Sequence, residues 1–134
     1  MIALALLSGL ALAPANCDSA NPRIFPRVQI VSTEMDTNGL GNLLAKKFAL
    51  RDKDVLQASI EAPAPDQLQQ LDGIIYKQKV SLLLGRPGEA PTLTFHSTGL
   101  GDSRTASIRK ALEAIKPSSE QLDTLHYTLT PCNR

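Results

Sequence analysis

Hydrophobic and polar residues alternate along several stretches of the chain, and this pattern predicts β-strands. In the stretch 27–34, Val28, Ile30 and Val31 are β-branched, and turn-forming residues follow them. The same reasoning predicts further strands at 55–60, 74–84, 92–97 and 122–130. Residues 85–89 contain Pro and Gly in positions typical of a turn, so the strands on either side should form a hairpin.

A second periodicity predicts two helices. Apolar residues recur at helical spacing between residues 40 and 50, at Leu40, Leu43, Leu44 and Phe48. Another apolar stripe consists of Ile108, Ala111, Leu112 and Ile115. Asp102 or Ser103 is the expected N-cap of this second helix, and Pro117 should end it.

The order of these elements predicts an α+β fold. Pro63 and Pro65 break the chain after the second strand, and Asp66 could cap a short helical turn ending near Leu71. The elements then follow as β-α-β-(short α)-β-β-α-β, which predicts a mixed, mostly antiparallel sheet of about five strands. We expect two main helices packed on one face of this sheet, and a single α+β domain over residues 16–134.

Alternation within the predicted strands separates a helix-covered face from an open, polar face. Leu93 and Phe95 should point towards the helices, together with Val80 and Leu82. The open face would carry hydroxyl groups, two lysines and both histidines, which favour contact with acidic groups and make that contact sensitive to pH. We predict partner binding through Lys77, Lys79, Thr92, Thr94, His96, His126 and Thr128.

The N-terminal segment is typical of a secretory signal peptide. Residues 2–13 are apolar and uncharged, and this run is shorter than the about 20 residues that a transmembrane helix needs. Ala13-Pro14-Ala15 provides a small-x-small cleavage site. No Lys or Arg precedes the run, which leaves a buried N-terminal helix as the alternative. We predict a signal peptide over residues 1–15, a periplasmic or secreted protein, and no transmembrane segment in the mature chain.

Cys17 and Cys132 are the two cysteines of the chain, and they lie near the two ends of the predicted mature protein. In an oxidising compartment they would most simply form one disulfide that ties the termini together. The alternative is lipidation of Cys17. That processing favours a Leu three residues before the cysteine and a small residue just before it, whereas Pro14 and Asn16 occupy these positions.

Composition and charge narrow the range of partners. The chain has 134 residues, with 14 Lys plus Arg against 13 Asp plus Glu, and a formal net charge of +1. This balance gives no reason to expect a nucleic-acid partner, which a strongly basic face would indicate. The sequence contains two Tyr, three Phe and no Trp, so a platform for stacking bases or sugars is hard to assemble.

The chemistry-bearing residues form no recognised catalytic motif. His96 and His126 are the obvious candidates, but no His-x-x-x-His or Glu-x-x-His pair is present to begin a metal site. No Gly-x-Ser-x-Gly nucleophile motif occurs. Residues 99–103, Gly-Leu-Gly-Asp-Ser, lack the spacing of a phosphate-binding loop and are interpreted as a tight strand-to-helix turn. We predict a non-enzymatic protein without cofactor or metal.

Two glycine-containing segments support a family resemblance. The segment 39–44, Gly-Leu-Gly-Asn-Leu-Leu, opens the first helix, and 97–103 precedes a helix containing Ala106, Ala111 and Ala114. Over residues 27–130 the chain resembles the amino-terminal domain of TolB and the CsgG-like domain of bacterial envelope assembly lipoproteins. The resemblance implies a non-enzymatic adaptor that binds other envelope proteins, and it carries over no catalytic residue. The sequence departs from this group in its poor lipidation site and its terminal cysteines.

Three functional hypotheses follow from these patterns. The first is an exported protein-binding domain that acts as an envelope assembly or secretion adaptor, with another envelope or secreted protein as its partner. The second is a periplasmic immunity or inhibitor protein that blocks a toxin or a lytic enzyme. The third is a small hydrolase that uses His96 or His126.

Overall fold

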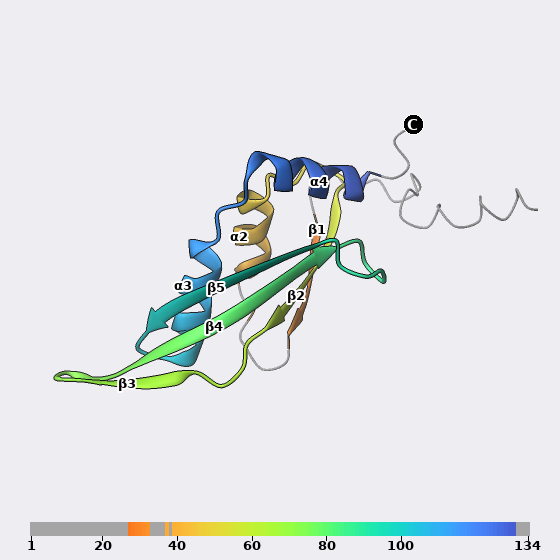
Figure 1. The fold of residues 1–134 in the computed structure, drawn as a ribbon. Coiled ribbons are helices and arrows are strands. Elements are labelled where there is room, and N and C mark those ends of the chain that lie inside the picture. The colour runs from red at the N-terminus through yellow and green to blue at the C-terminus, as the bar shows by residue number, and fades with distance from the viewer. Residues whose placement is uncertain (1–26, 33–36, 38, 131–134) are drawn as a thin grey trace, which may run out of the picture.

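The structure is a computed structural model that describes residues 27–32, 37 and 39–130. In this part of the chain a five-stranded mixed sheet and three helices confirm the predicted α+β fold. Figure 1 shows the strands β1 (Arg27–Ser32), β2 (Val55–Glu61), β3 (Asp66–Gln70), β4 (Gly73–Gly85) and β5 (Leu93–Gly101). It also shows the helices α2 (Leu40–Lys47), α3 (Arg104–Ala114) and α4 (Ser119–Leu129).

The long strand β4 organises the sheet. Its residues 81–85 pair antiparallel with β2, and its residues 73–77 pair antiparallel with β3. β5 pairs with residues 76–84 of β4, overlapping both sets, so it lies on the opposite edge of β4. β2 and β3 therefore follow one another along one edge of β4, and β1 adds in parallel to β2.

Two helices cover one face of the sheet and form the core with it. α3 lies against β4 and β5, while α2 lies against β1. Their apolar stripes face the core as predicted, with Leu43 partly buried, and the rings of Phe48 and Phe95 lie with centroids 5.4 Å apart. The buried hydrophobic residues from the helices include Leu40, Leu44, Phe48, Ile108, Ala111 and Leu112, and those from the strands include Leu56, Ala58, Ile60, Val80, Leu82 and Leu84.

The contact between α3 and β5 is close enough to exclude side chains from part of the strand. A Cβ atom at Gly99 would overlap the carbonyl oxygen of Ser107 and the backbone nitrogen of Ala111. A Cβ atom at Gly101 would lie 2.7 Å from the backbone nitrogen of Ser107. Glycine is required at these two positions because the helix backbone occupies the space of a side chain.

Two structural predictions for residues before α3 are wrong. Residues 66–70 form strand β3 and not a helical turn, because Leu71 and Asp72 reverse the chain and allow pairing with the start of β4. The strand predicted at 92–97 is confirmed and continues to Gly101, so the turn predicted at 99–103 is wrong for its two glycines, which belong to β5. The predicted cap of the next helix is confirmed, since Ser103 Oγ accepts a 3.1 Å hydrogen bond from the Ala106 backbone nitrogen.

The last predicted strand is also wrong, because residues 119–129 form helix α4. Ser118 begins this helix with a capping box. Its hydroxyl accepts from the Gln121 backbone nitrogen at 3.1 Å, and its own backbone nitrogen donates to Gln121 Oε1 at 2.8 Å. Leu122, Leu125 and Leu129 then fall on one side of the helix and pack against the core. The described part of the chain therefore has three helices where the sequence indicated two main ones.

The predicted signal peptide, and both Cys17 and Cys132, lie outside the described residues. The disulfide and the lipidation alternative both remain predictions. No helix within the described part of the chain combines the length and the hydrophobicity that crossing a membrane requires.

Replacing Gly99 with alanine tests the close helix contact. The Gly99→Ala variant should lose about 1–3 kcal/mol of unfolding free energy, because α3 must move away from β5. Gly41→Ala is the matched control: its new Cβ would lie 3.9 Å from Val28 Cβ, an ordinary contact, and alanine favours a helix by about 0.5–1 kcal/mol. Urea denaturation of both variants measures the difference, and equal midpoints would contradict the proposed packing.

Candidate functional site

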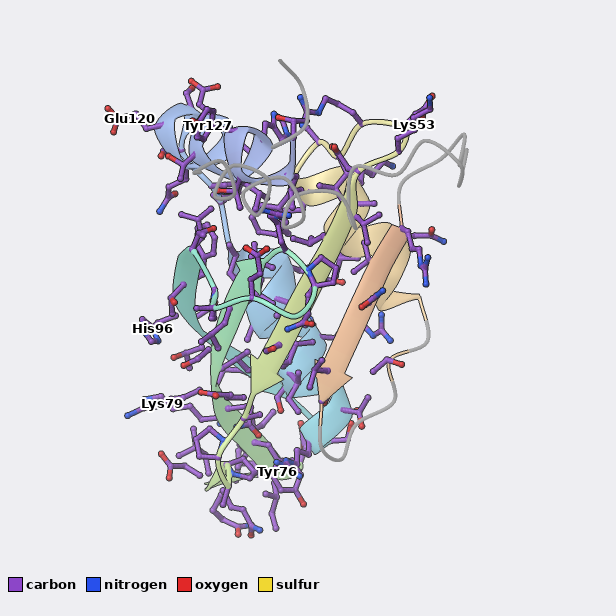
Figure 2. The ribbon with its side chains drawn as sticks, turned by 90° about the vertical axis from the view of Figure 1, so that its right-hand side faces the viewer. Lys53, Tyr76, Lys79, His96, Glu120 and Tyr127 are labelled. Carbon is purple, nitrogen blue, oxygen red and sulfur yellow. The ribbon has the colours of Figure 1, made fainter. Side chains whose placement is uncertain are left out.

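The candidate site is the face of the sheet opposite α2 and α3, which we call the open face. Figure 2 views the sheet from this side, with both helices behind it. Lys79 and His96 are labelled at the left-hand edge of the sheet in this view. No helix or strand of the described residues covers this face. Its side chains come from alternate positions of β1, β2, β4 and β5, namely Arg27, Gln29, Val31, Gln57, Ser59, Glu61, Lys77, Lys79, Ser81, Leu83, Thr94, His96, Thr98 and Leu100.

Strand pairing arranges these side chains in rows across the face. Leu83 lies between Ser59 of β2 and Thr94 of β5. In the next row Ser81 lies between Glu61 of β2 and His96 of β5. Lys79 and then Lys77 follow Ser81 on the same face of β4, at successive steps of two residues away from Leu83. The side chains that β4 itself contributes thus change from the apolar Leu83 to the polar Ser81 and then to the two lysines.

Ser81 and His96 form a hydrogen-bonded pair on this face, with 3.0 Å between Ser81 Oγ and His96 Nδ1. The contact joins two residues that are registered across β4 and β5, so the strand pairing itself positions the imidazole. A catalytic triad needs a carboxylate against the other nitrogen of the imidazole. Glu61 lies on the opposite side of Ser81 from His96, so this row does not have the geometry of a triad.

Lys77 and Lys79 place positive charge on the part of the open face that β4 and β5 form. Both side chains are exposed, and neither takes part in any of the ion pairs or side-chain hydrogen bonds of the described chain. Lys79 lies opposite Thr98, and Lys77 lies between Asp66 and Leu100. The ammonium groups are therefore available to an external acidic group without first breaking an internal ion pair.

The structure places four of the predicted site residues on the open face, namely Lys77, Lys79, Thr94 and His96. Thr92 lies just before β5, where its backbone nitrogen donates to the Leu84 carbonyl at 2.8 Å and closes the hairpin. Ser81 and Thr98 were not among the predicted contacts. The alternation of β4 already places Ser81 on the same face as the two lysines, whereas Thr98 required the full length of β5.

His126 and Thr128 do not belong to this face, because they lie on helix α4. His126 Nε2 is 3.0 Å from the carbonyl oxygen of Phe48. Its own carbonyl oxygen accepts a 3.0 Å hydrogen bond from Arg51 Nη2. The hydroxyl of Thr128 donates to the Thr124 carbonyl within the same helix at 2.9 Å. His126 thus fastens α4 to the segment after α2, and its predicted place on the open face is wrong.

Metal-ligating side chains do not gather on this part of the molecule. Within residues 27–32, 37 and 39–130, no three His, Cys, Asp or Glu residues lie close enough together to hold a metal ion. His96 and Glu61 are the residues of these types in the central row of the open face, and Ser81 separates them.

No protein-family model matches this chain, and neither the curated proteins nor the solved structures contain a significant match. The resemblance to the TolB and CsgG-like domains therefore remains a prediction from the sequence.

Replacing each histidine with alanine separates the structural histidine from the surface histidine. His126→Ala should lower the free energy of unfolding by about 1–2 kcal/mol, because the contact with the Phe48 carbonyl is lost. His96→Ala is the control on the exposed strand, and it should change stability by less than about 0.5 kcal/mol. Thermal unfolding of the two variants measures this difference, and a larger loss in His96→Ala would reverse the assignment.

Proposed function

We propose that this chain is an exported, non-enzymatic domain that binds another envelope or secreted protein through the open face. The role that fits best is that of an adaptor in envelope assembly or secretion. The observation that carries the proposal is that Lys77 and Lys79 are exposed, form no ion pair with another described residue, and lie on a sheet face that no described helix or strand covers. The predicted signal peptide and the resemblance to envelope assembly domains support the same compartment.

The backbone beneath the lysines favours binding at low entropic cost. Lys77 pairs with both β3 and β5, and Lys79 pairs with β5, so the strand that carries them is held by its neighbours. Thr94 and Thr98 are short and β-branched, so they lose little rotamer freedom when a partner covers them. A surface that is already ordered in the free protein loses less conformational entropy when the complex forms.

The charge of this surface indicates the kind of partner. Unpaired lysines beside the hydroxyl groups of Thr98 and Ser81 favour carboxylates on the partner protein. Such contacts chiefly increase the association rate and select against basic partners, and they weaken as the salt concentration rises. The apolar Leu83 at the other end of the face could then be covered by a non-polar part of the same partner.

Charge reversal on the open face tests this proposal. The double variant Lys77→Glu, Lys79→Glu should reduce the recovery of the partner from a periplasmic extract by about tenfold or more, because both favourable contacts become repulsive. Recovery is measured by quantitative mass spectrometry against the unaltered protein. The melting temperature should fall by no more than a few degrees, since both side chains are exposed and the added strain is limited to the carboxylate of Asp66, which is registered with position 77.

The double variant Lys46→Glu, Lys110→Glu is the matched control. Both lysines are exposed on the helix side, on α2 and α3, and the change in net charge is the same. This control should retain the partner. Equal loss in both double variants would indicate a nonspecific charge effect, and a partner lost only on altering residues 99–103 would place the interface at the start of α3.

A further inference from the structure

The hairpin formed by β3 and the first part of β4 extends beyond the helices that cover the rest of the sheet, as Figure 1 shows. All five residues of β3 are exposed, whereas buried residues alternate with half-buried or exposed ones along β2, β5 and the rest of β4. β3 is therefore the strand of the described sheet that has solvent on both of its faces. Among the described strands, none pairs with its outer edge.

Side-chain hydrogen bonds fix the segment that precedes this hairpin. The amide of the buried Gln78 donates from Nε2 to the Pro63 carbonyl at 2.6 Å and to the Lys79 carbonyl at 2.9 Å. Arg104 Nη2, from α3, donates to the Ala62 carbonyl at 2.8 Å. The segment that leads into β3 is thus bonded to both β4 and α3, and the strand is presented in a defined position.

The pattern of strand pairing shows which backbone groups face outwards. Leu71 and Asp72 form a two-residue turn, because Gln70 is registered with Gly73. Residues that flank such a turn exchange hydrogen bonds with each other, and the bonding direction then alternates along the strand. The N–H and C=O groups of Gln67 and Gln69 therefore point away from β4, ready to pair with another strand.

The side chains of β3 match a second copy of the same strand. Leu68 is 39% exposed and lies opposite Ile75 of β4 on the same face of the sheet. In an antiparallel pair centred on Leu68, the two leucines face each other, and Gln67 of one copy exchanges hydrogen bonds with Gln69 of the other. Asp66 then faces Gln70 of the second copy, so no like charges meet.

We propose that β3 pairs antiparallel with β3 of a second copy of this chain, centred on Leu68, and forms a two-fold symmetric dimer. The pairing continues the sheet from β4 of one copy to β4 of the other. Leu68 and Ile75 of both copies form an uninterrupted apolar row across the junction. A C2 interface of this kind uses one self-complementary patch and closes at two subunits.

The length of the ladder limits the strength of this dimer. Pro65 precedes β3 and has no N–H group, so the new ladder is confined to the five residues of β3. Such a contact is smaller than a standard protein interface, and the dimer should dissociate on dilution. Dimerisation would also present two open faces at once, which raises the avidity for a repetitive partner.

Sedimentation velocity over a range of protein concentrations tests the dimer. The purified mature protein should shift towards about twice the monomer mass as its concentration rises. Leu68→Lys should raise the dissociation constant by at least about tenfold, because two ammonium groups would face each other at the centre. Leu71→Lys is the control. It makes the same exchange at the fully exposed turn, outside the ladder, and should dimerise like the unaltered protein.

Oxidative cross-linking tests the register. Facing residues of a non-hydrogen-bonded pair lie about 4.5 Å apart between Cα atoms, so Leu68→Cys should form a covalent dimer under mild oxidation. Gln69→Cys, which lies opposite Gln67 in the proposed pairing, should not. Both variants contain the same two native cysteines, so background cross-linking is shared.

Three results would overturn the proposal. The first is a protein that stays monomeric at every concentration, which would leave the edge of β3 free or reserve it for a different protein. The second is weaker dimerisation of Leu71→Lys than of Leu68→Lys, which would indicate association through the apolar hairpin tip. The third is equal cross-linking of Leu68→Cys and Gln69→Cys. None of these results bears on partner binding by Lys77 and Lys79, because a monomer can still present the open face.

Discussion

The approach of helix α3 to strand β5 at Gly99 is the constraint on which the rest of the structure depends. The helix backbone there lies where a side chain would otherwise be, so α3 is held close against the sheet. α3 lies against β4 and β5, and Ile108 and Leu112 of this helix are buried in the core. This packing also decides which face of the sheet the helices cover, and thereby which face is left to solvent.

Helix α2 is joined to this arrangement by a polar contact as well as by packing. Lys47, in its last turn, donates from Nζ to the carbonyls of Glu113 and Ile115, at 2.9 and 2.8 Å. These carbonyls lie at the end of α3, where the helix dipole favours a positive charge. α2 and α3 are thus bound to each other on one side of the sheet. α4 closes the end of this layer through the contact of His126 with the Phe48 carbonyl.

The spacing of apolar residues predicted an element correctly where it fits either a helix or a strand but not both. It failed where the same residues fit the period of a helix and that of a strand. The stripe of α3 and the alternation of β4 are unambiguous, and both are observed. Residues 122–130 satisfy alternation through Leu125, Tyr127 and Leu129, but Leu122, Leu125 and Leu129 also satisfy a helix. The capping box at Ser118 decides between these readings. β3 was missed for another reason: its exposed residues gain their strand conformation only from pairing with β4.

The same distinction explains which parts of the open face could be predicted. Lys77, Lys79, Thr94 and His96 were placed correctly because burial of their neighbours, such as Val80 and Phe95, fixes the direction of every second side chain. His126 was misplaced together with its element. Folding requires apolar residues at the inward positions of a strand but accepts many residue types at the outward positions. A pattern of burial can therefore identify an open surface without identifying what binds it. The partner must instead be inferred from the outward chemistry, which here is positive charge on a strand already held by its neighbours.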